Sequence, residues 1–146
     1  MNRALQRLTA LEWHYAGGDP KALAELARRI TDVGRTPKDF ISYSQLVADV
    51  TFKLPNVHGG KPFEIHDWTN LDRAIIGEFL GRLSVDSYRE GEFFASALVI
   101  GSDSNGPGAG FYSLAKQAGL LTSSDEMTRL EFWLDHVRRA RQWYAD

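Results

Sequence analysis

The stretch of this chain best suited to chemistry is the glycine-rich loop that follows an apolar run. Residues 93–119 read FFASALVIGSDSNGPGAGFYSLAKQAG, and the loop holds glycines at positions 101, 106, 108 and 110. A loop that leads from a strand into a helix can aim several backbone amides at one anion. The composition therefore predicts a candidate anion site at Gly106, Gly108 and Gly110. The simpler alternative is a tight strand-to-helix connection in which glycine supplies positive φ.

The loop does not match the common nucleotide-binding fingerprints. Gly101 and Gly106 are spaced as in a phosphate-binding P-loop, but a Pro-Gly pair stands where that motif has lysine and a hydroxyl residue. The glycines also lack the spacing of dinucleotide sites. An enzyme or sensor for a small phosphorylated ligand is therefore the weakest interpretation, because the loop offers it few polar side chains: Ser102, Asp103 and Ser104.

The other reactive residue types form no catalytic constellation. The chain has no cysteine, which excludes disulfides, thiolate metal sites and thiol nucleophiles. His58, His66 and Asp67 lie in a segment rich in glycine and proline without the spacing of metal ligands, so we expect them to be exposed. We predict neither a cofactor nor a metal ion, and the residues point away from an enzyme without excluding one.

Composition frames the class of protein. A chain of 146 residues with 43% hydrophobic and 25% charged residues fits one globular domain. The net charge of -2 argues against a surface that is wholly devoted to nucleic acid, although a local basic patch remains compatible with it. No apolar run is long enough for a membrane span or has the form of a signal peptide. We therefore expect a cytoplasmic protein without a membrane partner.

Hydrophobic spacing predicts a mostly helical α+β fold in one domain, residues 1–146. A helix over residues 3–16 should end at a Gly-Gly pair, and Asp19 and Pro20 should start a second helix that Gly34 closes. The short connection predicts an antiparallel helical hairpin over residues 1–34.

Residues 41–122 should form the core of the domain. Ser42 and Gln45 make a capping box for a helix that fades near Lys53, and residues 56–68 indicate an irregular loop or a short edge hairpin. Thr69 should cap the next helix, whose predicted buried stripe is Leu71, Ile75, Ile76, Phe79, Leu80 and Leu83. Residues 84–91 read as one further helical turn, residues 94–100 as the best strand, and residues 111–118 as a short helix.

A long C-terminal helix should occupy most of residues 123–146. Ser123 or Ser124 is the expected N-cap, and the helix should run to about Tyr144. Its predicted inner face comprises Met127, Leu130, Leu134, Val137 and Tyr144. The small β-sheet and the core would thus be flanked by N-terminal and C-terminal helices.

One face of the fourth predicted helix is unusually bare. Arg73, Gly77 and Gly81 are four residues apart and so share a face. Each glycine inside a helix costs about 1 kcal/mol relative to alanine. Either another element packs closely on this strip, or the strip approaches a binding partner with Arg73 reaching beyond it.

Several of these segments resemble the alkyltransferase-like DNA-binding proteins, relatives of the DNA alkyl-repair methyltransferases. The segment ISYSQLVA at residues 41–48 is similar to the family's tyrosine-glycine-x-x-alanine element, with Ser44 in place of the glycine. DRAIIGEFL, with Arg73 and Gly77, is similar to its recognition helix, and residues 95–119 could supply the strand, loop and helix that follow. The strand-loop-helix block is also similar to uncharacterised bacterial and phage proteins.

The resemblance implies a winged-helix-like, helix-turn-helix core and a role in DNA binding. By resemblance, Arg73 would enter the duplex to support a flipped nucleotide, and Tyr43 would contact the phosphate backbone. The family's proline-cysteine-histidine-arginine-valine core is absent, because ASALV stands at residues 95–99. Without cysteine the resemblance implies no alkyl transfer.

The leading interpretation is a non-catalytic module that binds nucleic acid, most simply duplex DNA. Its predicted contacts are Tyr43, Arg73, Gly77, Gly106, Gly108 and Gly110. Arg138, Arg139 and Arg141 would widen the basic footprint, unless Asp135 pairs with them on a solvated helix face.

The alternative is a protein-interaction module, such as a bacterial or phage-encoded inhibitor or accessory protein with one protein partner. It is suggested by the near-neutral charge and by four tryptophans: Trp13, Trp68, Trp133 and Trp143. An exposed apolar patch near Trp68 or Trp143 would favour a protein partner, whereas a positive stripe through Arg73 would favour nucleic acid.

Overall fold

The computed structural model of the protein describes residues 2–101 and 106–145. The described residues are 61% helical and contain a small sheet of two parallel strands, consistent with an α+β fold. In chain order the elements are α1 (Arg3–Thr9), α2 (Pro20–Gly34), β1 (Ile41–Ser42), α3 (Tyr43–Val47), the 3₁₀ turn η1 (His58–Gly60), α4 (Asn70–Gly91), the 3₁₀ turn η2 (Ala95–Leu98), β2 (Val99–Ile100), α5 (Ala109–Gln117) and α6 (Glu126–Ala145).

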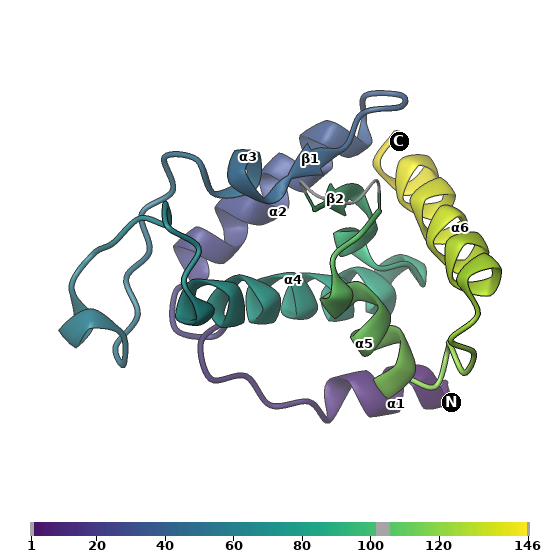
Figure 1. Cartoon of the computed structure of the whole chain (residues 1–146), viewed down its shortest axis with the longest axis horizontal. Coiled ribbons are helices and arrows are strands. Elements are labelled where there is room, and N and C mark those ends of the chain that lie inside the picture. Colours follow the sequence, from purple (N-terminus) through teal and green to yellow (C-terminus); the bar gives the residue numbers. More distant parts are fainter. Residues whose placement is uncertain (1, 102–105, 146) are drawn as a thin grey trace.

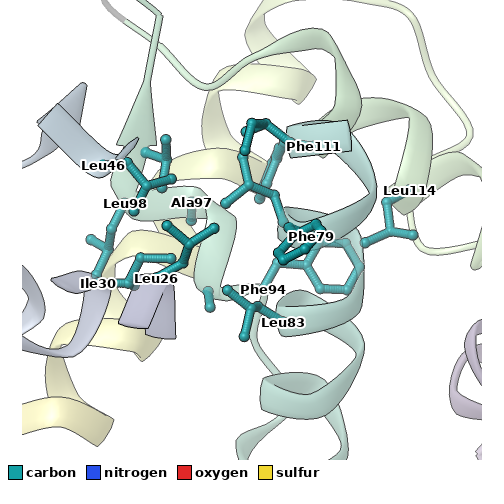
Figure 2. Packing of buried hydrophobic residues seen from close by; sticks show 14 of the residues in the cluster. Leu26, Ile30, Leu46, Phe79, Leu83, Phe94, Ala97, Leu98, Phe111 and Leu114 are labelled. Atoms are coloured by element: carbon teal, nitrogen blue, oxygen red, sulfur yellow. The ribbon is translucent and has the colours of Figure 1, made fainter. Parts of the chain in front are cut away.

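Helix α4 runs through the middle of the molecule, and the other elements pack around it (Figure 1). In this view α2, α3 and β1 lie on one side of α4, α1 and α5 lie on the other, and α6 forms an outer edge. Figure 2 shows the core where Leu26 of α2, Phe79 of α4 and Phe94, which precedes η2, converge. None of the helices described here is long and apolar enough to cross a membrane.

Three of the predicted helix starts are confirmed by their hydrogen bonds. The Asp19 carboxylate accepts from the backbone nitrogen of Ala22 at 3.0 Å, and Pro20 opens α2. Ser42 and Gln45 form the expected capping box at α3. Thr69 caps α4, where Asp72 completes a second capping box. The start of α6 differs, because the Asp125 carboxylate, and not Ser123 or Ser124, accepts from the Thr128 nitrogen at 3.1 Å.

The first predicted helix is too long, because α1 ends at Thr9. The backbone nitrogens of Tyr15 and Ala16 donate to Glu78 Oε1 of α4, at 2.7 and 3.4 Å, instead of continuing a helix. The predicted hairpin over residues 1–34 is also wrong, since α1 packs on α4 and α5. Arg7 of α1 donates to the Ala118 carbonyl at the end of α5.

The predicted strand over residues 94–100 is wrong except for β2, because η2 occupies most of it. The segment is buried, and side chains of the neighbouring helices take up its backbone groups. Ser87 Oγ donates to the Phe93 carbonyl and accepts from the Ala95 nitrogen. The Ser96 nitrogen donates to Ser84 Oγ of α4. From α6, His136 Nδ1 accepts from the Phe94 nitrogen, and Trp133 Nε1 donates to the Ala97 carbonyl. With its polar groups satisfied this way, the segment needs no long strand partner.

The middle of the chain differs from expectation at three places. Helix α3 ends at Val47, well before Lys53, and residues 84–91 belong to one continuous α4. The edge hairpin that was one alternative for residues 56–68 is supported, because Phe63 exchanges two backbone hydrogen bonds of 2.8 Å with Phe52, which precedes that segment. Leu71 of the predicted buried stripe is exposed, whereas the other five members are buried.

Helix α6 presents a different face to the core from the predicted one. The structure buries Trp133, His136, Val137 and Ala140. Of the predicted inner residues, Met127, Leu130 and Leu134 are exposed. Burial of Trp133 and His136 follows from their hydrogen bonds to the backbone around η2, which leucine cannot make.

Arginines from distant parts of the chain bind the carboxyl ends of four helices. Arg29 donates to the carbonyls of Gln45, Leu46 and Ala48 at the end of α3. Three other arginines bind helix ends in the same manner. Arg7 donates to the Ala118 carbonyl at the end of α5, Arg139 to the Glu92 carbonyl at the end of α4, and Arg35 to the Tyr144 carbonyl at the end of α6. Each guanidinium satisfies carbonyls that have no partner within their own helix.

Candidate binding site

A cleft of about 620 Å³ lies between α4, the start of α3 and the start of α5. Its volume is within the range of small-molecule sites, and its wall is largely apolar. The described residues that line it are Ser42, Tyr43, Ser44, Trp68, Arg73, Ile76, Gly77, Leu80, Gly81, Ser96, Gly101, Gly108, Ala109, Gly110, Phe111 and Leu114.

The cleft brings together most of the residues that the sequence singled out. Tyr43, Arg73, Gly77, Gly108 and Gly110 all line it, although they come from three separate segments. The sixth predicted residue, Gly106, is not part of the wall. The polar loop side chains considered above lie outside the described residues: Ser102, Asp103 and Ser104.

Tyr43 closes one side of the cleft by packing directly on Gly108. A Cβ atom at position 108 would collide with the Tyr43 hydroxyl, so only glycine leaves room for it. The Tyr43 ring meets Trp68 edge-on, with centroids 5.9 Å apart. Burial raises the pKa of Tyr43, which keeps its hydroxyl protonated. Among the described residues this hydroxyl has no hydrogen-bond partner, so it can donate to a ligand.

The amino end of α5 lines the cleft beside Tyr43. Gly108 is its N-cap and supplies no side-chain cap, so the first backbone amides of α5, at Ala109 and Gly110, lack a partner within the helix. The positive end of the helix dipole adds to the attraction for an anion. Of the glycines predicted for an anion site, Gly108 and Gly110 thus lie at the helix start and line the cleft, whereas Gly106 does not line it.

Arg73 supplies the positive charge of the cleft. Its side chain is exposed, and no hydrogen bond or ion pair joins its guanidinium to any residue of 2–101 or 106–145. The arginines expected to widen the footprint are engaged elsewhere. Arg138 and Arg139 pair with Asp135 at 2.6 and 2.9 Å, and Arg141 donates to the carbonyls of Thr36 and Asp39.

The two glycines on this face of α4, Gly77 and Gly81, have different surroundings. An added Cβ at Gly77 would meet no atom within 4 Å, so this glycine leaves open space in the cleft. Gly81 instead lies under the indole of Trp13. Both glycines also line a second, separate cavity of about 310 Å³, whose described wall includes Trp13, Glu12 and Glu78. Close packing therefore explains Gly81 but not Gly77.

Replacing Gly77 by alanine is expected to stabilise the fold by about 1 kcal/mol, because a helix prefers alanine and the methyl group has room. Gly81→Ala is the matched control. Its methyl group would meet Trp13 Cη2 at 2.9 Å, so the gain should vanish or reverse. Urea denaturation of the two variants measures the difference, and equal stabilities would contradict the geometry.

Trp68 and Ser96 are among the wall residues that were not predicted as site residues. Trp68 immediately precedes the helix cap Thr69, and its positive φ of 52° turns the chain into α4. Ser96 is 7% exposed, and Ser84 Oγ donates to its Oγ at 2.8 Å. The sequence signal for Ser96 was its position within the apolar run ASALV, because a hydroxyl buried there requires a hydrogen-bond partner.

The described wall can bind an anion but offers little for proton transfer. It contains no aspartate, glutamate or histidine, while it supplies a guanidinium, helix amides and hydroxyls. Among the described residues no group of three or more His, Asp or Glu could hold a metal ion, and His58 and His66 are exposed. Comparison with family models, curated proteins and solved structures finds no match.

Proposed function

We propose that this protein is a non-catalytic DNA-binding module whose cleft receives a phosphate and a base of the DNA. The observation that carries the proposal is the convergence of Tyr43, Arg73, Gly108 and Gly110 on one cavity. Arg73 and the α5 amides suit a phosphate, and the rings of Tyr43 and Trp68 suit a base. In this proposal α3 and α4 are the helix-turn-helix pair of a winged-helix-like core.

The shape of the cleft favours recognition of a single nucleotide over contact with a flat duplex face. Ile76, Leu80, Phe111 and Leu114 give it an apolar floor that a phosphate alone would leave empty. A duplex that offers one unpaired nucleotide is therefore the proposed ligand. The resemblance to proteins that support a flipped nucleotide agrees with this expectation.

Replacing Arg73 by alanine is expected to weaken DNA binding about tenfold, because a charge-assisted contact to phosphate is lost. Fluorescence anisotropy with a labelled 20-base-pair duplex that contains one unpaired nucleotide, at low and moderate salt, measures the change. The slope of affinity against salt should also become shallower.

Arg3→Ala is the matched control for this measurement. Arg3 is exposed and lies on α1, and its side chain, like that of Arg73, has no hydrogen bond or ion pair within the described chain. Its loss should leave affinity nearly unchanged. Equal effects of the two substitutions, or no binding at low salt, would overturn the proposal.

A further inference from the structure

Helix α6 carries an exposed apolar stripe that the cleft does not use. Met127, Leu130 and Leu134 are 60%, 42% and 49% exposed. Their spacing of three and four residues places them on one face of the helix, which we call the α6 stripe. α6 lies at an outer edge of the molecule (Figure 1), and none of its residues lines the cleft.

Acidic side chains flank the α6 stripe on both sides. At 100° per residue, Glu126 lies on one side of the three apolar positions and Glu131 on the other. Neither glutamate forms an ion pair in the part of the chain that the structure describes. The nearby Arg129 stacks its guanidinium on the Tyr112 ring at 4.1 Å and forms no ion pair with either glutamate in the described structure.

We infer that the α6 stripe docks a cationic amphipathic helix of a protein partner. Such a helix offers an apolar ridge to Met127, Leu130 and Leu134, and lysine or arginine to the two glutamate rims. An acidic rim repels nucleic acid and anionic lipid by like charge, so neither suits this face. The surface is thus separate from the proposed DNA site and serves a different partner.

A second copy of the chain fits the α6 stripe poorly. In a parallel pair Glu126 of one copy would face Glu131 of the other, which is repulsive. An antiparallel pair centred on Leu130 brings the two Glu131 side chains together. Shifting the centre to Leu134 places Met127 against Arg141, whose guanidinium is already held by the carbonyls of Thr36 and Asp39.

The probe for this inference is a labelled 14-residue helical peptide of leucine and lysine, with the leucines on one face. Fluorescence anisotropy should show binding to the full chain. A peptide of the same pattern with glutamate in place of lysine should bind at least tenfold more weakly. Leu130→Gln combined with Leu134→Gln should reduce binding of the lysine peptide at least tenfold.

Two further variants make the result specific. Glu126→Lys combined with Glu131→Lys should reverse the preference, so that the glutamate peptide binds better. Leu71→Gln, which changes an exposed leucine on α4, should have no effect. Failure of the lysine peptide to bind, or binding that ignores the stripe substitutions, would overturn the inference. So would a dimer in sedimentation that Leu134→Gln dissociates, because the stripe would then belong to a second copy.

Discussion

Gly108→Ala is expected to destabilise the protein by about 1–3 kcal/mol and to abolish binding in the cleft. The new methyl group would collide with the Tyr43 hydroxyl, which packs directly on this glycine. Either Tyr43 or the start of α5 must then move, and both are walls of the cleft. Urea denaturation measures the stability loss, and anisotropy with the DNA probe measures the loss of binding.

A double-mutant cycle tests the assigned cause. Tyr43→Phe removes the oxygen that the methyl group meets, so it should restore part of the stability lost in Gly108→Ala. Restoration should be incomplete because Tyr43 Cζ would still lie 3.0 Å from the added Cβ. Gly110→Ala is the control, since a Cβ there meets no atom within 4 Å. An equal loss in Gly110→Ala, or no coupling between positions 43 and 108, would refute the explanation.

Lowering the pH from 7 to 4.5 is expected to remove roughly 2–3 kcal/mol of folding stability through His136 alone. This side chain is 2% exposed, and its Nδ1 accepts from the Phe94 nitrogen at 3.0 Å. Burial and the nearby Arg139 lower its pKa from 6.5 to about 4, although Asp135 acts in the opposite direction.

The sign follows from the lowered pKa in the folded state. Above pH 6.5 the histidine is neutral in both states, and its contribution to stability is complete. As the pH falls towards 4, the unfolded chain takes up the proton while the fold resists it, so stability is lost. Arg28 and Arg29 lower the pKa of Glu25 to about 2, so its contribution is lost only below pH 4.5 and does not mask the effect.

His136→Asn is the variant that isolates this effect. Its Oδ1 can still accept from the Phe94 nitrogen, but the side chain does not titrate. The variant should be less stable at pH 7 and should lose much less stability between pH 7 and 4.5 than the parent does. His66→Asn, at an exposed histidine, should keep the parental pH dependence. A parental pH slope in His136→Asn would rule out His136 as the source.

The sequence was most informative where local chemistry decides the structure. Asp19, Ser42 and Thr69 start helices because their side chains bind backbone amides only three residues away. The candidate site was also largely predictable. Arg73 and Gly77 departed from what a helix packed into a core requires, and Gly108 departed from ordinary loop composition.

Prediction failed where distant side chains replace backbone partners. Residues 94–100 are continuously apolar, which is typical of a strand, but Ser87, His136 and Trp133 bind their backbone groups from α4 and α6. The hydrophobic spacing of α6 predicted the wrong buried face for the same reason. Leucines were assigned to the core, whereas the hydrogen bonds around η2 require Trp133 and His136 there. Only the three-dimensional pairing reveals which polar side chains the interior needs.

The arginines at the helix ends change how the positive charge of the protein is distributed. Each lies against the negative end of a helix dipole, which offsets part of its field. The sequence contains 17 lysines and arginines, but the positive potential that acts on a diffusing anion is weaker than that number implies. Arg73 lies near the amino end of α4, where the dipole reinforces its charge. Electrostatic steering should therefore favour the mouth of the cleft, even for a molecule whose net charge is negative.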